Sequence, residues 1–207
     1  PTDLIYREGS PDILYVHGKG QLDIMQRLLN WPANTLRFTP SLRFKKNNLG
    51  TFTRRIFLPY SFSEREIILS GLESYFQMNT VNSLPRMVIK GHPVQLSSKK
   101  HILLMKGIET ILEKYHDRFD ENSQRQGSIF IGATAAIIEA LERSVEVVHI
   151  TSDPVFESHQ ADIWKDIEVT AISQNVYLYK LRKKGCYIQL GNDQEGLARI
   201  VAEVNKN

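Results

Sequence analysis

Short apolar runs alternate with longer segments of helical periodicity along most of this chain. Four of the runs have the length and composition of buried strands, and they are residues 55–59, 86–90, 128–131 and 145–150. Apolar residues at spacings of three and four predict amphipathic helices between and after them, at a segment that begins near Ser63 and at residues 98–117, 134–143 and 193–205. Strands and helices that alternate in this way form parallel sheets covered by helices on both faces. The sequence therefore predicts an α/β fold with a Rossmann-like parallel sheet.

Weaker patterns complete this part of the chain. Strands are expected at residues 168–172 and 186–190, and a short helix at residues 156–164. Residues 176–181 fit either a strand or an irregular turn. The helix near Ser63 begins with the spacing of a capping box, because a glutamate follows this serine three residues later.

The front of the chain has a pattern of its own. Residues 12–17 are predicted as a strand, residues 20–29 as a helix that ends before Pro32, and residues 35–38 as another strand. The polar residues 45–50 are typical of a linker. We therefore expect a remnant of an amino-terminal domain with its crossing segment at 1–46, a linker at 47–53 and the Rossmann-like domain at 54–207. The first residue, Pro1, suggests a piece of a longer protein.

Composition excludes several functional classes. The 26 basic and 23 acidic residues leave a net charge of only +3, and the basic residues are scattered in pairs, so no nucleic-acid partner is expected. The single cysteine, Cys186, excludes an internal disulfide and multi-cysteine zinc sites, and is expected to be buried in a protein of the reducing cytoplasm. No apolar run approaches the length of a membrane span. Asp153, Glu157 and His159 lie close in sequence, but nothing completes a metal site, so no metal is expected.

Parallel α/β sheets bind ligands outside the carboxyl ends of their strands. This rule selects four loops, Pro59–Ser63, Lys90–Val94, Gly132–Ala136 and Thr151–Phe156. In the first of them Ser61 is a candidate ligand contact.

The second loop begins with Lys90, Gly91, His92 and Pro93. A histidine fixed at a strand exit can donate a hydrogen bond to a phosphate oxygen and can carry positive charge near neutral pH. The alternative is a tight strand exit with a half-exposed histidine.

The third loop, Gly132-Ala133-Thr134-Ala135, turns a strand into a helix through small residues. Small residues let an anion approach the first free N–H groups of a helix, although the loop is neither a Walker motif nor a dinucleotide motif. Glu139 on the following helix has apolar flanks, so its carboxylate needs a partner, which a ribose diol would supply. The alternatives are helix–sheet packing for the alanines and a salt bridge or a solvated position for Glu139.

Four other histidines rank lower. His17 ends a strand and faces either the same cleft or solvent. His149 lies in an apolar strand and is expected in the core. His101 and His116 are expected on the exposed face of the long helix.

The order of these motifs resembles the carboxyl-terminal domain of GT-B-fold glycosyltransferases of bacterial surface polysaccharide synthesis, in particular the sialyl- and Kdo-transferase-like groups. Their His-Pro strand exit is matched by His92-Pro93, and their small-residue turn with an Ile-Ile-Glu-Ala-Leu helix by residues 132–141. The front of the chain resembles the last βα unit of the amino-terminal domain. The resemblance implies that His92 is catalytic, that the His-Pro element and the turn contact the nucleotide, and that Glu139 holds the ribose. The paired serines or threonines of the family are here a single Thr134.

The same resemblance implies a CMP- or UDP-linked sugar as donor substrate, no cofactor, a glycan acceptor, and a missing amino-terminal domain without which the chain binds donor poorly and transfers nothing. A cytoplasmic location at the inner membrane face, with peripheral membrane association of the full-length protein, would follow. Two alternatives stay open: an epimerase or polyol-phosphate transferase of the same fold, and a non-catalytic interaction module in which His92, Thr134 and Glu139 do not share a cleft.

Overall fold

The computed structural model describes residue 9 and residues 11–45, 52–79, 84–132, 136–152, 163–191 and 193–205. Contacts within the chain group it into two compact units. One unit contains Gly50–Leu181, and the other combines Pro1–Leu49 with Arg182–Asn207. No helix in the described ranges is long and apolar enough to cross a bilayer.

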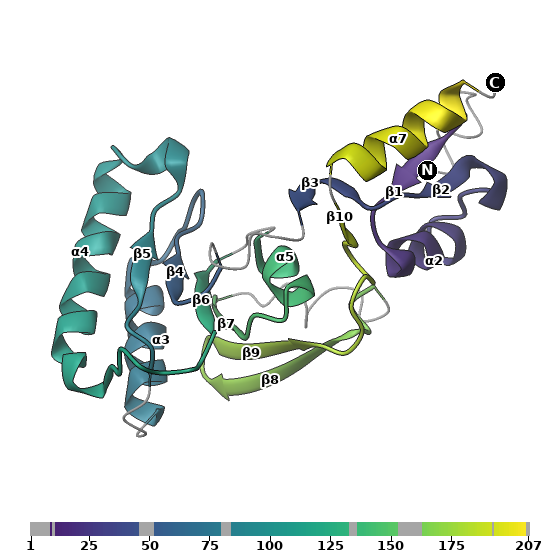
Figure 1. Cartoon of the computed structure of the whole chain (residues 1–207). Helices are drawn as coiled ribbons and strands as arrows, with labels where there is room; N and C mark the ends of the chain where they lie inside the picture. The colour runs from purple at the N-terminus through teal and green to yellow at the C-terminus, as the bar shows by residue number, and fades with distance from the viewer. Residues whose placement is uncertain are drawn as a thin grey trace. The chain divides into compact units, whose positions relative to one another are not determined.

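A six-stranded sheet forms the centre of the unit Gly50–Leu181, with the strand order β5-β4-β6-β7-β9-β8 (Figure 1). Its strands are β4 (Arg55–Phe57), β5 (Val88–Lys90), β6 (Ser128–Ile131), β7 (Val147–Ile150), β8 (Ile167–Ser173) and β9 (Val176–Leu181). The first four strands in this order are parallel, whereas β9 runs antiparallel to both β7 and β8. The predicted α/β class with a mostly parallel sheet is thus confirmed, and residues 176–181 form a strand.

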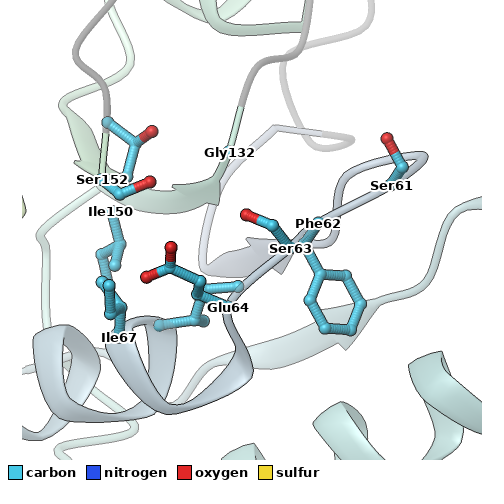
Figure 2. Close-up of a pocket in the computed structure, with 10 residues that line it drawn as sticks. Ser61, Phe62, Ser63, Glu64, Ile67, Gly132, Ile150 and Ser152 are labelled. Atoms are coloured by element: carbon cyan, nitrogen blue, oxygen red, sulfur yellow. The ribbon is translucent and has the colours of Figure 1, made fainter.

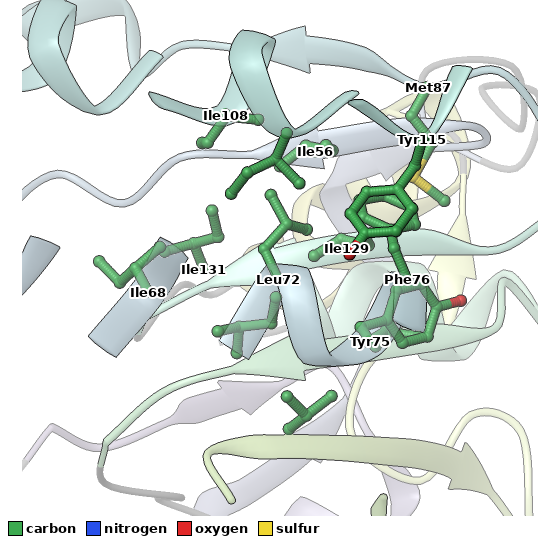
Figure 3. Packing of buried hydrophobic residues seen from close by; sticks show 14 of the residues in the cluster. Ile56, Ile68, Leu72, Tyr75, Phe76, Met87, Ile108, Tyr115, Ile129 and Ile131 are labelled. Carbon is green, nitrogen blue, oxygen red and sulfur yellow. The ribbon is translucent and has the colours of Figure 1, made fainter. Parts of the chain in front are cut away.

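Among the described residues of this unit, the helices α3 (Arg65–Met78), α4 (Lys99–Lys114) and α5 (Ala136–Glu142) pack on this sheet, and short 3₁₀ turns cover Pro93–Gln95 and His116–Arg118. Residues alternate between the two faces of a strand. Ile129 and Ile131 of β6 lie in one core cluster with the buried side chains of α3 and α4, as Figure 3 shows. Phe130, between them, faces the opposite side, where α5 packs on β7 and β9 and where the ring of Phe57 stacks on it at 4.6 Å. Every residue of β6 and β7 is buried, which explains their mostly apolar sequence.

The hairpin between β8 and β9 ends the sheet. Asn175 in its turn has φ +65°, a left-handed conformation that asparagine tolerates better than most residues. Residues 156–162 of the predicted short helix lie outside the described residues.

The other unit contains two small parallel sheets. In the first, β1 (Leu14–Val16) pairs with β2 (Leu36–Phe38), and in the second, β3 (Ser41–Lys45) pairs with β10 (Leu190–Gly191). Helices α2 (Lys19–Arg27) and α7 (Asp193–Val204) and a 3₁₀ turn at Ala33–Thr35 complete it.

Residues 182–207 fall within the predicted domain 54–207. In the structure they belong to the other unit, where they pack on the front of the chain. The reason is that these residues and the front of the chain come very close together at two glycines. A Cβ atom on Gly18 would lie 2.3 Å from the carbonyl oxygen of Cys186, and one on Gly196 would lie 2.3 Å from the end of the Leu42 side chain. The predicted strand 186–190 therefore does not join the large sheet, and only its last residue enters β10. Because Gly196 forms the contact, Leu197, Val201 and Val204 of α7 are exposed.

Candidate functional site

The strand order of the large sheet reverses between β4 and β6. After β4 the chain continues to β5 on one side, and after β6 it continues to β7 on the other side. Ligands of open α/β sheets bind at such a switch point, outside the carboxyl ends of the strands. A pocket of about 440 Å³ lies there (Figure 2), and it is lined by Ser61, Phe62, Ser63, Glu64, Ile67, Ile68, Gly132, Ile150, Thr151 and Ser152.

Three of the four loops selected from the sequence contribute to this pocket. The loop after β4 supplies Ser61, a candidate contact, and the loop after β6 supplies Gly132. The end of β7 supplies Thr151 and Ser152. The loop after β5 does not line the pocket.

A carboxylate that sequence reasoning missed lies in the pocket. Glu64 is the residue before the first turn of α3, and its side chain makes no capping hydrogen bond. Because the N-cap is Glu64 and not Ser63, the predicted capping box is not formed. Figure 2 shows the Glu64 carboxylate pointing into the pocket near Ser63 and Ser152. A carboxylate accepts hydrogen bonds and serine hydroxyls both donate and accept, so this group of side chains suits a ligand rich in hydroxyl groups.

A buried histidine holds the backbone of the pocket residue Gly132 in place. Gly132 has φ +63°, which glycine adopts without the strain that a side chain brings. The Nε2 atom of His149 lies 2.9 Å from the carbonyl oxygen of Gly132, and its Nδ1 atom lies 2.8 Å from the hydroxyl of Tyr179. A carbonyl only accepts, so Nε2 carries the proton and Nδ1 accepts from Tyr179. Burial lowers the pKa of His149 to about 4, and the ring is therefore neutral near pH 7. Its predicted core position is confirmed.

The other members of the small-residue turn, Ala133, Thr134 and Ala135, lie outside the described residues. The predicted contact of Thr134 with a phosphate stays a prediction.

Glu139 is engaged in a buried ion pair. Its carboxylate accepts hydrogen bonds from Arg143 at 2.7 and 3.1 Å, and the side chains are only 12% and 1% exposed. The Arg143 guanidinium also lies over the ring of Phe52. This is the salt bridge weighed as an alternative to ribose binding, and Glu139 is not among the residues that line the pocket.

His92 lies beside the pocket loop without lining the pocket. Its ring meets the ring of Tyr60 edge-on at 5.3 Å, and Tyr60 directly precedes Ser61. The Nδ1 atom of His92 is buried and has no hydrogen-bond partner in the described part of the chain. Lys90, two residues earlier, is exposed, Gly91 is half-buried and Pro93 begins the 3₁₀ turn.

The start of α4 is tied to the same loop. His101, expected on the exposed face, is buried instead, and its Nε2 atom lies 3.0 Å from the carbonyl oxygen of Pro59. The reason is its spacing, since His101 precedes the buried Leu104 and Ile108 by three and seven residues and so shares their stripe. Lys100 donates to the carbonyl oxygen of Phe62, and its ammonium lies 4.5 Å from that ring.

Other candidates from the sequence lie away from this pocket. His17 belongs to the other unit, where its Nδ1 atom lies 3.2 Å from the Thr39 carbonyl oxygen. Cys186 is buried, as predicted. The described residues contain no cluster of three or more side chains suited to a metal ion, and the triplet Asp153, Glu157 and His159 lies outside them.

Comparisons of the chain with known protein families, curated proteins and solved structures find no match.

Proposed function

We propose that the pocket at the switch point binds the nucleotide-activated sugar of a GT-B-like glycosyltransferase, of which this chain is the donor-binding part. The observation that carries the proposal is the position of the pocket between the exits of β4 and β6, where open α/β sheets bind nucleotides. Its volume of about 440 Å³ falls in the range of small-molecule sites.

The polar groups in the pocket suit a sugar or ribose. Glu64 offers two acceptor oxygens to a diol, and Ser61 and Ser63 add hydroxyl groups. In this proposal Glu64 takes the role that the resemblance assigns to Glu139, whose carboxylate is held by Arg143. Phe62 and Ile67 supply apolar surface against which a ring can pack.

Basic groups beside the pocket suit the phosphates. His92 packs against Tyr60 and Lys100 against Phe62, so both contact the loop that leads into the pocket. Lys90 precedes His92 at the same strand exit. A nucleotide phosphate near this loop would meet a partly cationic surface, and charge-assisted hydrogen bonds are the stronger kind.

The reaction that follows is displacement at the anomeric carbon of the sugar. The bond between this carbon and the phosphate oxygen breaks while an acceptor hydroxyl oxygen bonds to the carbon. His92, beside the pocket loop, donates to the negative charge that develops on the departing phosphate. The acceptor site and the base that takes the acceptor proton belong to the amino-terminal domain by the family resemblance. Such an enzyme of surface polysaccharide synthesis would act in the cytoplasm at the inner membrane face.

Thermal unfolding with and without nucleotide tests the proposal. A ligand that binds only the folded state at about 100 times its Kd stabilises that state by about 2.7 kcal/mol, so CMP or UDP should raise the melting temperature. Glu64→Gln should reduce the shift from a CMP- or UDP-sugar. Glu66→Gln is the matched control, because Glu66 is an exposed carboxylate of the same helix start and lies outside the pocket. Equal shifts for both variants, or none for any nucleotide, would contradict the proposal.

Nucleotide binding alone would not separate transfer from epimerisation. Analysis of the products that the longer protein forms from a nucleotide-sugar and a glycan acceptor makes this distinction. A new glycosidic bond supports the proposal, and an isomerised donor without transfer refutes it.

A further inference from the structure

Another cavity lies at the opposite edge of the large sheet from the proposed nucleotide pocket. Its volume is about 500 Å³, which falls in the range of small-molecule sites. Arg86 and Met87, which directly precede β5, line it from the amino end of a strand. The rest of the lining comes from the second half of α4 and from the segment that follows this helix. The cavity shares no lining residue with the first pocket.

One part of the lining is apolar. It consists of Met87, which is buried, and of Leu112 and Phe119, which are half-buried. Phe119 is held in place because its ring meets the ring of Phe76 edge-on at 5.6 Å and its backbone bridges to Leu84. Aliphatic and aromatic side chains offer contact to the apolar part of a ligand, and the face of an aromatic ring also attracts a cation.

The charged side chains of the cavity have a negative excess. Arg86 is paired with Glu121, with 3.4 Å between the Nη1 and Oε1 atoms. Glu109 and Glu113, in contrast, make no ion pair with any residue in the described ranges. They follow each other at i and i+4 on α4, a spacing at which like charges destabilise a helix. A bound cation would relieve this repulsion.

The end of α4 makes a negative charge less favourable still. The last carbonyl groups of a helix carry partial negative charge, and Glu113 lies in the last turn, whose basic residue Lys114 is bound to Glu73. His116 donates through Nδ1 to the carbonyl oxygen of Glu113 at 2.8 Å, so Nε2 of the neutral ring is an acceptor. A cation in this cavity would therefore meet carboxylates, an imidazole acceptor and the negative end of a helix.

We propose that this cavity binds a guanidinium group on an apolar stem, carried by an arginine side chain of a peptide or by a free alkylguanidine. A guanidinium has five N–H donors in a planar fork, is weakly hydrated and stacks on aromatic rings. These properties fit two carboxylates one helical turn apart, Glu109 and Glu113, with the ring of Phe119 in the same lining. The stem lies against Met87 and Leu112. The proposal does not depend on what the first pocket binds.

NMR titration of the isotope-labelled protein with butylguanidine tests the proposal. Saturable shifts should appear in the second half of α4 and at residues 116–121, and butylurea, a neutral compound of similar shape, should not produce them. Each methylene that leaves water adds roughly four-fold to the affinity, so butylguanidine should bind at least about ten-fold more tightly than methylguanidine. Equal affinities for butylguanidine and butylurea would refute the argument from charge.

A pair of substitutions tests the two carboxylates. An exposed ion pair contributes up to about five-fold in affinity, so Glu109→Gln/Glu113→Gln should weaken butylguanidine binding by about 5- to 30-fold. Glu146→Gln/Glu168→Gln is the matched control, because it removes two exposed carboxylates of the same unit that lie outside the cavity. The control should leave the affinity unchanged. Circular dichroism checks that each variant is folded.

Arg86→Gln should change the affinity in the opposite direction. The substitution removes a positive charge from the cavity and frees the carboxylate of Glu121, so butylguanidine should bind up to about five-fold more tightly. Damage to the fold would weaken binding instead, which makes a gain in affinity specific to the proposed charge interaction.

A peptide distinguishes the two sources of the guanidinium. If acetyl-Leu-Arg-Leu-amide binds more tightly than butylguanidine, and its citrulline analogue does not bind, the ligand is an arginine of a peptide. If the peptide binds more weakly, the ligand is a free alkylguanidine. Three outcomes would overturn the proposal: absence of saturable shifts at this cavity with either compound, equal losses in the test and control pairs, and weaker binding by Arg86→Gln.

Discussion

The buried His149 should make the stability of the large-sheet unit depend on pH in a way that a single substitution removes. Burial lowers the pKa of this histidine from its ordinary value of 6.5 to about 4 in the folded protein. Below pH 6.5 the unfolded chain binds a proton that the folded chain does not bind, so stability falls as the pH falls toward 4. Above pH 6.5 neither state binds the proton, and this contribution to stability is fully present.

The magnitude follows from the two pKa values. Between about pH 7.5 and about pH 5, the differential protonation of a group with these pKa values lowers the free energy of unfolding by about 2 kcal/mol. His149→Gln cannot take up the proton, and its amide can still donate to the carbonyl oxygen of Gly132. The variant should be less stable than the wild type at about pH 7.5 because its geometry is imperfect, but its stability should fall by about 2 kcal/mol less on acidification.

Urea unfolding at the two pH values measures this difference. Trp164 lies in the unit that contains His149 and Trp31 lies in the other unit, so a Trp31→Phe background makes fluorescence report on the large sheet. His116→Gln is the matched control, because it replaces an exposed histidine of the same unit and leaves His149 in place. If His149→Gln lost as much stability on acidification as the wild type, the argument from burial would be refuted.

Two further substitutions test other parts of the site. Gly132→Ala should cost about 1–2 kcal/mol in urea unfolding, because alanine is strained at φ +63°, and should weaken nucleotide binding in the thermal assay; unchanged binding would separate this glycine from the ligand. Arg143→Met should cost about 3–5 kcal/mol because it leaves the Glu139 carboxylate buried without its arginine. Arg27→Met removes the arginine of an exposed helical pair and should cost less than about 1 kcal/mol; comparable losses for the two arginines would contradict the role of burial.

The elements that could be predicted from the sequence are those whose apolar pattern has one interpretation. Residues 128–131 and 147–150 are mostly apolar on both faces because helices cover both faces, and two of the four parallel strands, β6 and β7, follow from this pattern. The pocket loops follow from topology, since parallel strands end at the same edge of a sheet. Ser61 and Gly132 could be selected as pocket residues on this ground alone.

What could not be predicted depends on contacts between distant segments. The assignment of residues 182–207 depends on Gly18 and Gly196, which leave room for the Cys186 backbone and the Leu42 side chain, and a glycine in a sequence does not show what it approaches. The choice between Glu64 and Glu139 depends on an arginine one helical turn after Glu139, a pair that sequence shows only as a possibility. The spacing of His101 from Leu104 and Ile108, in contrast, does predict that His101 is buried on the same helix face.

Two buried imidazoles hold the backbone at the proposed site. The side chains that would contact the ligand are different residues. His101 donates to the carbonyl oxygen of Pro59 after β4, and His149 donates to that of Gly132 after β6. A Cβ atom on Gly132 would lie 3.3 Å from Pro59, so the two strand exits lie against each other. These two buried donors keep both exits in place. The hydroxyl group of Ser61 and the carboxylate of Glu64 are exposed and line the pocket, so they are the groups that would determine which ligand binds.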